Sequence, residues 1–181
     1  LKRYRELEEN ITEEIFRLLD APKKSLSKCH YTIEDAIRDC EADNGWEYTD
    51  EQKAAIRGCF ENNVCVITGK AGVGKSNSVK PIARFCAANN LLIAQTALSG
   101  RAASNLSEVT NIEGKTIHRL LEYNPKIGFQ RSKEFQLEEN VIIVDEMSMN
   151  DNELLYQLLQ AVSNGCKVIM LGDIAQLPSL G

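Results

Sequence analysis

The chain has 181 residues, of which 43% are hydrophobic and 26% are charged, and its formal net charge at pH 7 is −5. This length and composition are sufficient for one α/β domain with a buried core and some additional helix. The acidic balance excludes a globally basic nucleic-acid-binding surface, and no apolar run reaches the roughly 20 residues of a membrane-spanning helix or reads as a signal peptide.

Two helices are predicted in the first part of the chain. In residues 1–20 hydrophobic side chains recur at helical spacing between charged ones, and Pro22 follows where such a helix has to end. A polar connector then leads to a second helix at 32–42, in which Thr32 has the character of an N-cap. Both helices carry many charges, which indicates a solvated face on each of them.

A domain boundary is predicted after these helices. The sequence Asp43-Asn44-Gly45 is typical of a turn. We therefore expect a helical flanking segment at 1–46 and a separate domain at 47–181. The chain begins with Leu1 rather than Met, which indicates a piece of a longer protein.

The rest of the chain alternates strand-like and helix-like segments. A helix is expected from Thr49, which forms a capping-box pattern with Gln52. Four short apolar runs follow, at 64–68, 91–96, 141–145 and 166–171, and helical patterns lie between them, at 75–89, 99–108 and 150–163. This alternation predicts right-handed crossovers and a three-layer α/β fold around a mostly parallel sheet. The interval 109–140 is mixed, with a helical turn expected at 116–121 and a hairpin or loop at 128–136.

A phosphate-binding loop is the most specific motif of the chain. Residues 69–76 read GKAGVGKS, which completes the pattern G-x-x-x-x-G-K-[ST] between a predicted strand and a predicted helix. The backbone N–H groups of such a loop and the N-terminus of the following helix bind phosphates. Lys75 is expected to reach the β- and γ-phosphates of ATP, and the Ser76 hydroxyl to hold Mg²⁺. The nucleotide-binding residues predicted in this segment are Gly69, Ala71, Gly72, Val73, Gly74, Lys75, Ser76 and Asn77.

Further catalytic candidates follow two of the buried strands. Asp145 ends the run VIIVD, and Glu146 comes next, at the strand end where open α/β sheets bind their ligands. Asp145 is expected to hold Mg²⁺ directly or through water, and Glu146 to orient and deprotonate an attacking water. Gln176 follows the next strand and is expected to sense the γ-phosphate. Lys75, Glu146 and Gln176 are therefore the predicted catalytic residues.

The motifs and their order resemble those of superfamily 1 DNA helicases of the RecD/TraA-like group. The similar strings are YTDEQKAAI at 48–56, GKAGVGKS at 69–76, TALSGRAA at 96–103, KTIHRLL at 115–121, VIIVDEMSM at 141–149 and GDIAQLPS at 172–179. The resemblance implies a RecA-like P-loop NTPase domain, the first motor domain of a 5′→3′ helicase that uses ATP and Mg²⁺ on single-stranded DNA. It also implies a second motor lobe, and it leaves nuclease or recombination subunits as candidate partners.

The resemblance also implies roles for single residues. Gln52 stands at the position that reads adenine, whereas Trp46 and Tyr48 are expected to pack against the helix that starts at Thr49. The positions that contact the DNA strand are Ser99, Gly100, Arg101, Thr116 and His118. The plain alternatives are a surface arginine for Arg101 and a packed histidine for His118. In the third motif Ile174-Ala175 replace the common Pro-Asp pair, which removes a carboxylate there.

The cysteines bear on the cellular compartment, and two other functions also fit a phosphate-binding loop. The six cysteines form no C-x-x-C pair, which favours a reducing, cytoplasmic compartment, and Cys29-His30 lacks a second pair of zinc ligands. A small-molecule kinase also uses a phosphate loop, but it needs an arginine-rich lid that is not recognisable in this sequence. A nucleotide switch that binds ATP without hydrolysing it can dispense with Glu146.

Overall fold

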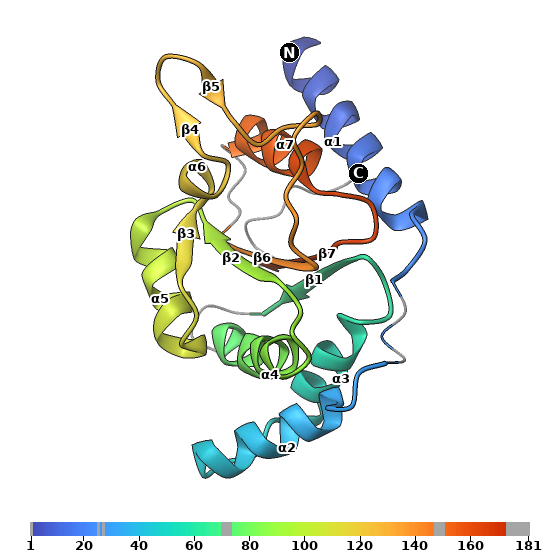
Figure 1. Cartoon of the computed structure of the whole chain (residues 1–181), viewed down its shortest axis with the longest axis vertical. Helices are drawn as coiled ribbons and strands as arrows, with labels where there is room; N and C mark the ends of the chain where they lie inside the picture. The colour runs from blue at the N-terminus through green and yellow to red at the C-terminus, as the bar shows by residue number, and fades with distance from the viewer. Residues whose placement is uncertain (1, 25, 27, 70–73, 147–150, 173–181) are drawn as a thin grey trace.

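The computed structural model describes residues 2–24, 26, 28–69, 74–146 and 151–172. Five strands form one sheet between two layers of helices (Figure 1). The strands are all parallel, in the order β1 (Val64–Thr68), β7 (Lys167–Gly172), β6 (Val141–Asp145), β2 (Ile93–Ala97) and β3 (Gly114–Thr116). The predicted three-layer α/β fold of the RecA-like P-loop type is confirmed.

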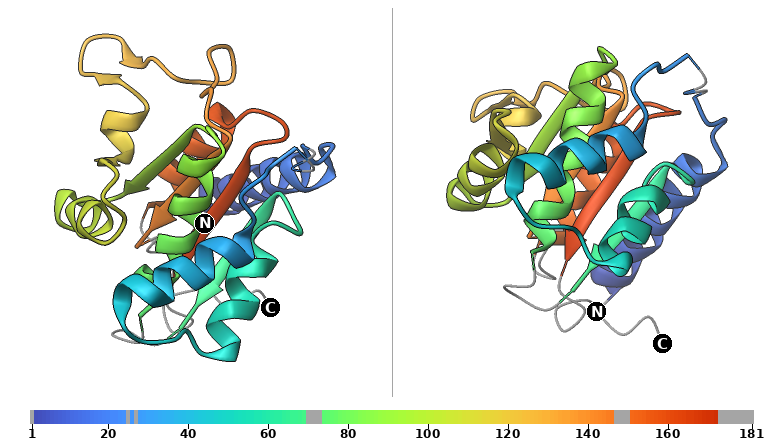
Figure 2. Two further views of the ribbon diagram at one scale, coloured as in Figure 1. Left: turned by 60° about the horizontal axis from the view of Figure 1, so that its bottom comes forward. Right: turned by 90° about the horizontal axis from the view of Figure 1, so that it is seen from below.

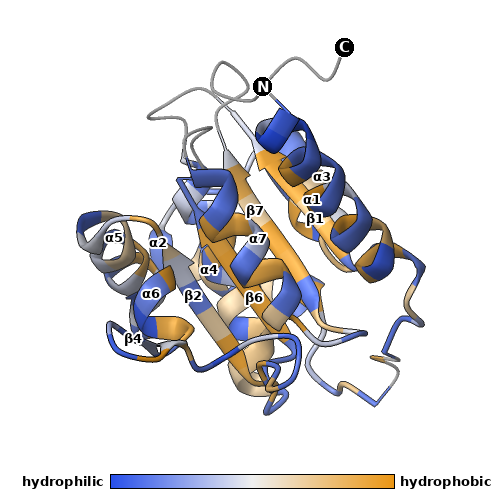
Figure 3. Ribbon diagram, turned by 90° about the horizontal axis from the view of Figure 1, so that it is seen from above, coloured by the Kyte–Doolittle hydropathy of each residue, from blue (hydrophilic) through white to orange (hydrophobic). Residues whose placement is uncertain are grey.

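Side chains of the central strand β6 alternate between two cores. Ile142 and Val144 face the layer of α1 (Lys2–Asp20), α6 (Ile117–Leu120) and α7 (Asn152–Ala161). Val141 and Ile143 face the layer of α2 (Ile33–Asn44), α3 (Asp50–Gly58), α4 (Lys75–Ala88) and α5 (Gly100–Thr110). Because both faces of the strand are covered, its sequence is continuously apolar. Figure 3 shows the contrast between the hydrophobic strands and the polar outer surfaces of the helices.

The two N-terminal helices each belong to one of these layers. α1 packs on α7, and the buried Asn63 at the start of β1 donates hydrogen bonds of 2.9 Å to the carbonyl oxygens of Leu18 and Ala21. These bonds satisfy carbonyls at the end of α1 that have no partner within the helix. On the other face α2 packs on α4 and buries Ile37 and Cys40 (Figure 2). The division between segment 1–46 and domain 47–181 stays a prediction, while the described helices of this segment share both cores.

None of the helices in the described ranges is both long enough and apolar enough to cross a membrane. α1 is the longest candidate, with 19 residues, but charged side chains occupy much of its length. Its hydrophobic positions form one stripe, in which Ile11 and Leu18 reach the core against α7 and the sheet. The helix is therefore a surface helix of a packed domain.

β3, the outermost strand of the sheet next to β2, is not among the strands predicted from the sequence. Gly114, Lys115 and Thr116 pair with β2 but contain no apolar run, so the hydrophobic pattern gave no signal for a strand. A close approach of β3 to α5 explains the glycine, because a Cβ atom on Gly114 would lie 2.2 Å from the carbonyl oxygen of Ala103. Packing against α5, rather than strand propensity, therefore determines where this strand lies.

The hairpin in the mixed interval lies earlier than the predicted range 128–136. β4 (Tyr123–Asn124) and β5 (Gly128–Phe129) pair antiparallel, and residues 130–136 contain no strand. Gly128 has a φ of 81°, a left-handed conformation that glycine adopts without strain. The expected start of the hairpin is thus its second strand, and the turn precedes it.

Replacing Asn63 with alanine should loosen the attachment of α1 to the sheet. The change leaves two helix-terminal carbonyls without their donor, and an unsatisfied buried group costs about 1–3 kcal/mol. We expect the melting temperature to fall by roughly 3–10 °C. The neighbouring exposed Asn62 is the control, because Asn62→Ala removes an amide that faces solvent. Equal melting temperatures for wild type and Asn63→Ala would contradict this role of Asn63.

Candidate functional site

The carboxyl ends of the strands meet at one edge of the sheet. Thr68 of β1 pairs with Gly172 of β7, and Ala97 of β2 pairs with both Asp145 of β6 and Thr116 of β3. The phosphate loop, the acidic pair and both predicted DNA-contacting segments lie at or directly after these strand ends. Ligands of open α/β sheets bind outside this edge. The parallel register therefore gathers most of the predicted site residues on one side of the molecule.

The helix that follows the phosphate loop begins with an uncapped N-terminus. Gly74 is the N-cap residue of α4, with a left-handed φ of 77°, and as a glycine it makes no side-chain cap to the first turn. The N–H of Asn77 donates to the Gly74 carbonyl oxygen, so the N–H groups that precede it are the ones suited to an anion, next to the positive end of the helix dipole. Ala71, Gly72, Val73 and Gln176 lie outside the described residues.

Lys75 reaches from the start of α4 over the end of the neighbouring strand. Its Nζ donates a hydrogen bond of 3.1 Å to the carbonyl oxygen of Gly172, the last residue of β7. Its aliphatic stem passes close to Gly69, where a Cβ atom would lie 3.3 Å from Lys75 Cγ. A glycine at position 69 therefore leaves room for the lysine to extend along the sheet edge.

Asp145 is a half-buried carboxylate within the electrostatic reach of Lys75. Burial raises the pKa of Asp145, and the charge of Glu146 raises it further. A hydrogen bond from the Glu146 N–H to Asp145 Oδ1, at 2.8 Å, and the positive charge of Lys75 lower the pKa in opposition. A carboxylate in this position gains from an added cation, since a cation offsets the cost of its burial.

A metal at this position would need oxygen ligands from beyond the acidic side chains. Among the described residues no three His, Cys, Asp or Glu side chains gather into a metal-binding group. Ser76 lies in the first turn of α4, next to Lys75, and this half-buried residue is the predicted partner of Asp145 in such a role. Mg²⁺ commonly binds to one or two protein oxygens together with phosphate oxygens and water. The donor set therefore fits magnesium carried by a nucleotide.

Glu146 differs from Asp145 in exposure and in backbone conformation. Its side chain is exposed, and its φ of 53° lies in the left-handed region that non-glycine residues rarely adopt. The strand therefore ends in a sharp turn directly after Asp145, which sends the two carboxylates to different surroundings. Such backbone strain concentrates at functional sites.

Gln52 lies against the phosphate loop while it also caps its own helix. Its Oε1 accepts a hydrogen bond of 2.9 Å from the Thr49 N–H, and its N–H donates to Thr49 Oγ1, which confirms the predicted capping box. Its Nε2 lies 3.3 Å from the place that a Cβ atom on Gly74 would occupy. The amide of Gln52 is thus placed at the start of α4, and Gly74 has no side chain to displace it.

The predicted DNA-contacting residues lie beside β2 and β3 at the same edge. Ser99 caps α5 through a hydrogen bond from the Ala102 N–H, Gly100 begins that helix, and Arg101 is exposed. Thr116 caps α6 in the same way, through the Arg119 N–H. These hydroxyls are therefore fixed by local capping near the strand ends.

His118 is exposed and belongs to a small aromatic cluster. Its ring lies 5.3 Å from the Tyr123 ring and 5.8 Å from the Phe129 ring, measured between centroids. The hairpin β4–β5 supplies both partners, so the histidine is packed on one side and open to solvent on the other. The alternative of a core histidine does not hold, because the side chain is not buried.

Two contacts at the site had no signal in the sequence. The acceptor of Lys75 is the main-chain oxygen of Gly172, and any residue type could supply it. Tyr48 is buried, which confirms its predicted packing, but its hydroxyl also donates a 3.0 Å hydrogen bond to the carbonyl oxygen of Asn77 in α4. Trp46 lies edge-on to Tyr48 and is 42% exposed.

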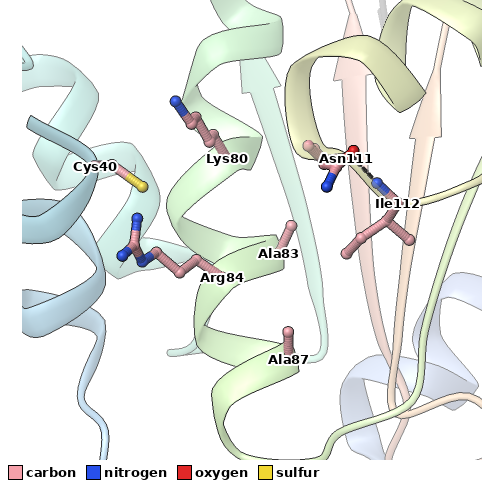
Figure 4. Close-up of a pocket in the computed structure, with 8 residues that line it drawn as sticks. Cys40, Lys80, Ala83, Arg84, Ala87, Asn111 and Ile112 are labelled. Atoms are coloured by element: carbon pink, nitrogen blue, oxygen red, sulfur yellow. Dashed lines mark hydrogen bonds between the residues drawn. The ribbon is translucent and has the colours of Figure 1, made fainter. Parts of the chain in front are cut away.

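A separate hollow of about 300 Å³ lies between α2, α4 and α5 (Figure 4). Cys40, Lys80 and Arg84 line one side of it, and Asn111 and Ile112 line the other. Both cations already have partners on α2, because Lys80 donates to Asn44 and Arg84 pairs with Asp43. The hollow lies along the middle and the C-terminal half of α4, away from Gly74, and no predicted nucleotide-binding residue lines it.

Comparison with known proteins shows the family of this chain. The AAA domain family (AAA_19) matches residues 52–181, from Gln52 through the phosphate loop and the acidic pair. The chain belongs to this family. It is similar to RecD and RecD2 proteins and to a Pif1 helicase.

Two curated relatives and one solved structure illustrate the likeness. The chain is 36% identical over 130 residues to the ATP-dependent RecD2 DNA helicase of Deinococcus radiodurans, covering 72% of this chain and 18% of that protein. It is 32% identical over 154 residues to the RecBCD enzyme subunit RecD of Mycobacterium tuberculosis, covering 72% and 27%. The crystal structure of the Pif1 helicase from Candida albicans matches with a TM-score of 0.54 and 25% identity, over 74% of this chain and 34% of that one. The chain thus spans between about a fifth and a third of these proteins.

Replacing Asp145 with asparagine should stabilise the nucleotide-free chain at neutral pH. Burial raises the folded-state pKa of Asp145 above its unfolded value, so this group makes the fold less stable as pH rises through that interval. Asparagine keeps an oxygen for the Glu146 N–H and removes the charge. We expect the melting temperature at pH 7 to rise by roughly 2–4 °C, the shift that ~1 kcal/mol produces in a chain of this size.

The pH dependence provides the control for that prediction. The gain should shrink as the pH is lowered until Asp145 of the wild type is protonated. Glu138→Gln removes the same charge from an exposed side chain and should give a much smaller change. A melting temperature that falls on Asp145→Asn, or a gain that does not depend on pH, would contradict the assigned burial cost.

Proposed function

We propose that this chain is an ATP-binding motor lobe that couples ATP hydrolysis to movement along single-stranded DNA. The observation that carries the proposal is the meeting of Lys75 and Asp145 at one sheet edge, beside the uncapped N-terminus of α4. A lysine ammonium, a half-buried carboxylate and the N-terminus of a helix are together suited to a metal-bound triphosphate. The names of the two curated relatives support the same interpretation, since one is an ATP-dependent RecD2 DNA helicase and the other the RecD subunit of the RecBCD enzyme.

The nucleotide is proposed to lie along the edge from Gln52 to Asp145. Gln52 offers its amide to the adenine, while Gly69, Gly74, Asn77 and the rest of the loop surround the phosphates. Lys75 neutralises the β- and γ-phosphates, and its hydrogen bond to Gly172 is exchanged for a phosphate oxygen. Ser76 and Asp145 are the residues that would hold Mg²⁺, and the metal would add positive charge beside the transferred phosphoryl group. Ala71, Gly72 and Val73 are proposed as phosphate contacts on the motif alone.

Hydrolysis is proposed to use Glu146 as the base. Its exposed carboxylate follows Asp145 through the sharp backbone turn, so it can accept the proton of a water that attacks the γ-phosphate. Gln176 is proposed to sense the γ-phosphate and to transmit its loss to the DNA. Nucleotide binding and chemistry are thus assigned to different residues. Lys75 and Ser76 act on the bound nucleotide, whereas Glu146 acts on the attacking water.

Single-stranded DNA is proposed to cross the part of the edge formed by β2 and β3. Ser99, Gly100 and Arg101 precede or begin α5, and Thr116 and His118 flank the start of α6, so their groups line one path. Hydroxyls, backbone N–H groups and an arginine are typical contacts to a phosphate backbone. The open side of the His118 ring is available for a base.

The complete motor is proposed to include a second RecA-like lobe and to move 5′→3′. Both features follow from the resemblance of the motifs to the RecD/TraA-like group. The second lobe would supply an arginine that stabilises the transition state, and such a residue is worth about 10³–10⁵ in rate. Nuclease or recombination subunits remain proposed partners, and the mycobacterial relative is itself named as a subunit of a larger enzyme.

The proposal predicts that binding and hydrolysis separate between Lys75 and Glu146. Lys75→Ala should weaken Mg²⁺–ATP binding by roughly tenfold to a hundredfold, because it removes a charged hydrogen bond worth about 1.5–3 kcal/mol. Glu146→Gln should leave binding unchanged but slow the residual hydrolysis by about 10²-fold or more. Calorimetry measures the first effect and single-turnover assays of labelled ATP measure the second.

Lys80→Ala is the matched control for these variants. It removes a cation from the same helix, but one that already pairs with Asn44 of α2. Normal nucleotide affinity is expected for this variant. Unchanged turnover in Glu146→Gln would indicate a different base, and phosphate transferred to an acceptor instead of released would indicate a kinase.

DNA binding by this chain should be weak and should fall steeply with salt. Phosphate contacts dominate such binding, and each lost contact to a single strand lowers the slope of log affinity against log salt by about 0.7. Arg101→Ala should therefore weaken binding and reduce the slope by about that amount. Lys24→Ala is the control, because Lys24 lies near Gly165, which precedes β7 at the amino ends of the strands, away from the proposed DNA path. Fluorescence anisotropy with a labelled oligonucleotide measures both, and binding that is insensitive to salt would refute backbone recognition.

A further inference from the structure

Pro81 lies in the interior of α4, where a proline leaves a gap in the hydrogen-bond pattern. It is the seventh residue of the helix, and it is buried. A proline has no N–H, so the carbonyl of the residue four positions earlier, Asn77, loses its helical donor. The proline ring also crowds that carbonyl and tilts it away from the helix axis. Asn77 immediately follows Ser76, so the gap opens in the turn that carries the predicted phosphate and magnesium ligands.

Tyr48 fills this gap from another part of the chain. Its hydroxyl donates a hydrogen bond of 3.0 Å to the carbonyl oxygen of Asn77. The ring is only 3% exposed and belongs to the core beneath α4, so the hydroxyl is held in place. Burial raises the pKa of Tyr48 to about 12, which keeps the hydroxyl protonated, and therefore a donor, across the physiological range. The bond that Pro81 cannot make is thus made by a side chain 33 residues away in the sequence.

The same segment contacts the start of α4 at a second point. Thr49 follows Tyr48 and fixes Gln52 through the capping box, and Gln52 Nε2 lies against Gly74. Glu41 of α2 holds the segment from the other side, because its Oε1 accepts a hydrogen bond of 2.9 Å from the Tyr48 N–H. The stretch from Tyr48 to Gln52 is therefore hydrogen-bonded to α2, and it contacts the first turn of α4 at both Gly74 and Asn77.

We propose that Tyr48 is a positioning residue of the nucleotide site, whose hydroxyl replaces the amide that Pro81 lacks and holds the first turn of α4 in its binding geometry. This inference rests on the proposed binding of Mg²⁺–ATP at that turn. Tyr48 does not touch the nucleotide in this account. It acts through Asn77 on the neighbouring Ser76 and Lys75, and it links the residue that reads the base to the turn that binds the phosphates.

A double-mutant cycle between Tyr48 and Pro81 tests the proposal. Tyr48→Phe keeps the ring but leaves the Asn77 carbonyl without a donor, and it should weaken Mg²⁺–ATP binding about fivefold to tenfold. Pro81→Ala restores the helical N–H to the same carbonyl. In the Pro81→Ala background, Tyr48→Phe should therefore change the affinity by less than about twofold. Tyr31→Phe is the control, since it removes a hydroxyl that bonds Asp39 of α2, and it should leave the affinity unchanged.

Melting temperatures of the wild type, the two single variants Tyr48→Phe and Pro81→Ala, and the double variant separate this inference from the proposed function. Tyr48→Phe should lower the melting temperature by about 2–6 °C alone and by clearly less in the Pro81→Ala background. Equal losses of affinity or of stability in both backgrounds, or no loss from Tyr48→Phe, would overturn the inference. If the wild type binds no nucleotide, the proposed function fails by itself, and the coupling in melting temperature still decides whether the hydroxyl replaces the amide.

Discussion

The reach of Lys75 across the end of β7 is the interaction on which the rest of the site depends. β7 separates β1, which leads into the phosphate loop, from β6, which ends at Asp145. Since neighbouring strands are about 4.8 Å apart, the ends of β1 and β6 stand roughly 10 Å from each other across the sheet. The lysine spans part of this distance, with its Nζ on the Gly172 carbonyl and its charge acting on Asp145. The strand order therefore brings the cation to the strand next to the carboxylate, an arrangement that suits a triphosphate with its metal.

This arrangement is useful only if the start of α4 is held firmly, and the fold supplies the support from outside the phosphate loop. Gly74 has no side chain, so Gln52 can lie against it, and the Tyr48 hydroxyl bonds the carbonyl of Asn77. The segment that carries both residues is fastened to α2 through Glu41. The N-terminal helices thus contribute to the site without containing any of its predicted ligands, because α2 steadies α4 while α1 covers the other face of the sheet.

The sequence predicted those parts of this arrangement that local patterns encode. VIIVD reads as a strand covered on both faces, and GKAGVGKS fixes a loop between strand and helix, so the fold class and the placement of Lys75 and Asp145 followed. β3 was not predicted, because the glycine at 114 reflects close contact with α5 and not strand propensity. The hydrogen-bond acceptors of Lys75 and Tyr48 could not be predicted, because both are main-chain oxygens, at Gly172 and Asn77. Such acceptors leave no trace in residue type, and only the fold brings them within reach.

The most direct test of the central claim is a crystal structure of the chain with Mn²⁺ and a non-hydrolysable ATP analogue, in which anomalous scattering locates the metal. The account predicts the metal between the phosphates and Asp145, with the Ser76 hydroxyl in its coordination shell and Lys75 Nζ moved from Gly172 to a phosphate oxygen. A nucleotide bound elsewhere, for example in the hollow between α2, α4 and α5, would contradict it. So would a metal whose coordination shell, including its bound waters, does not reach Asp145.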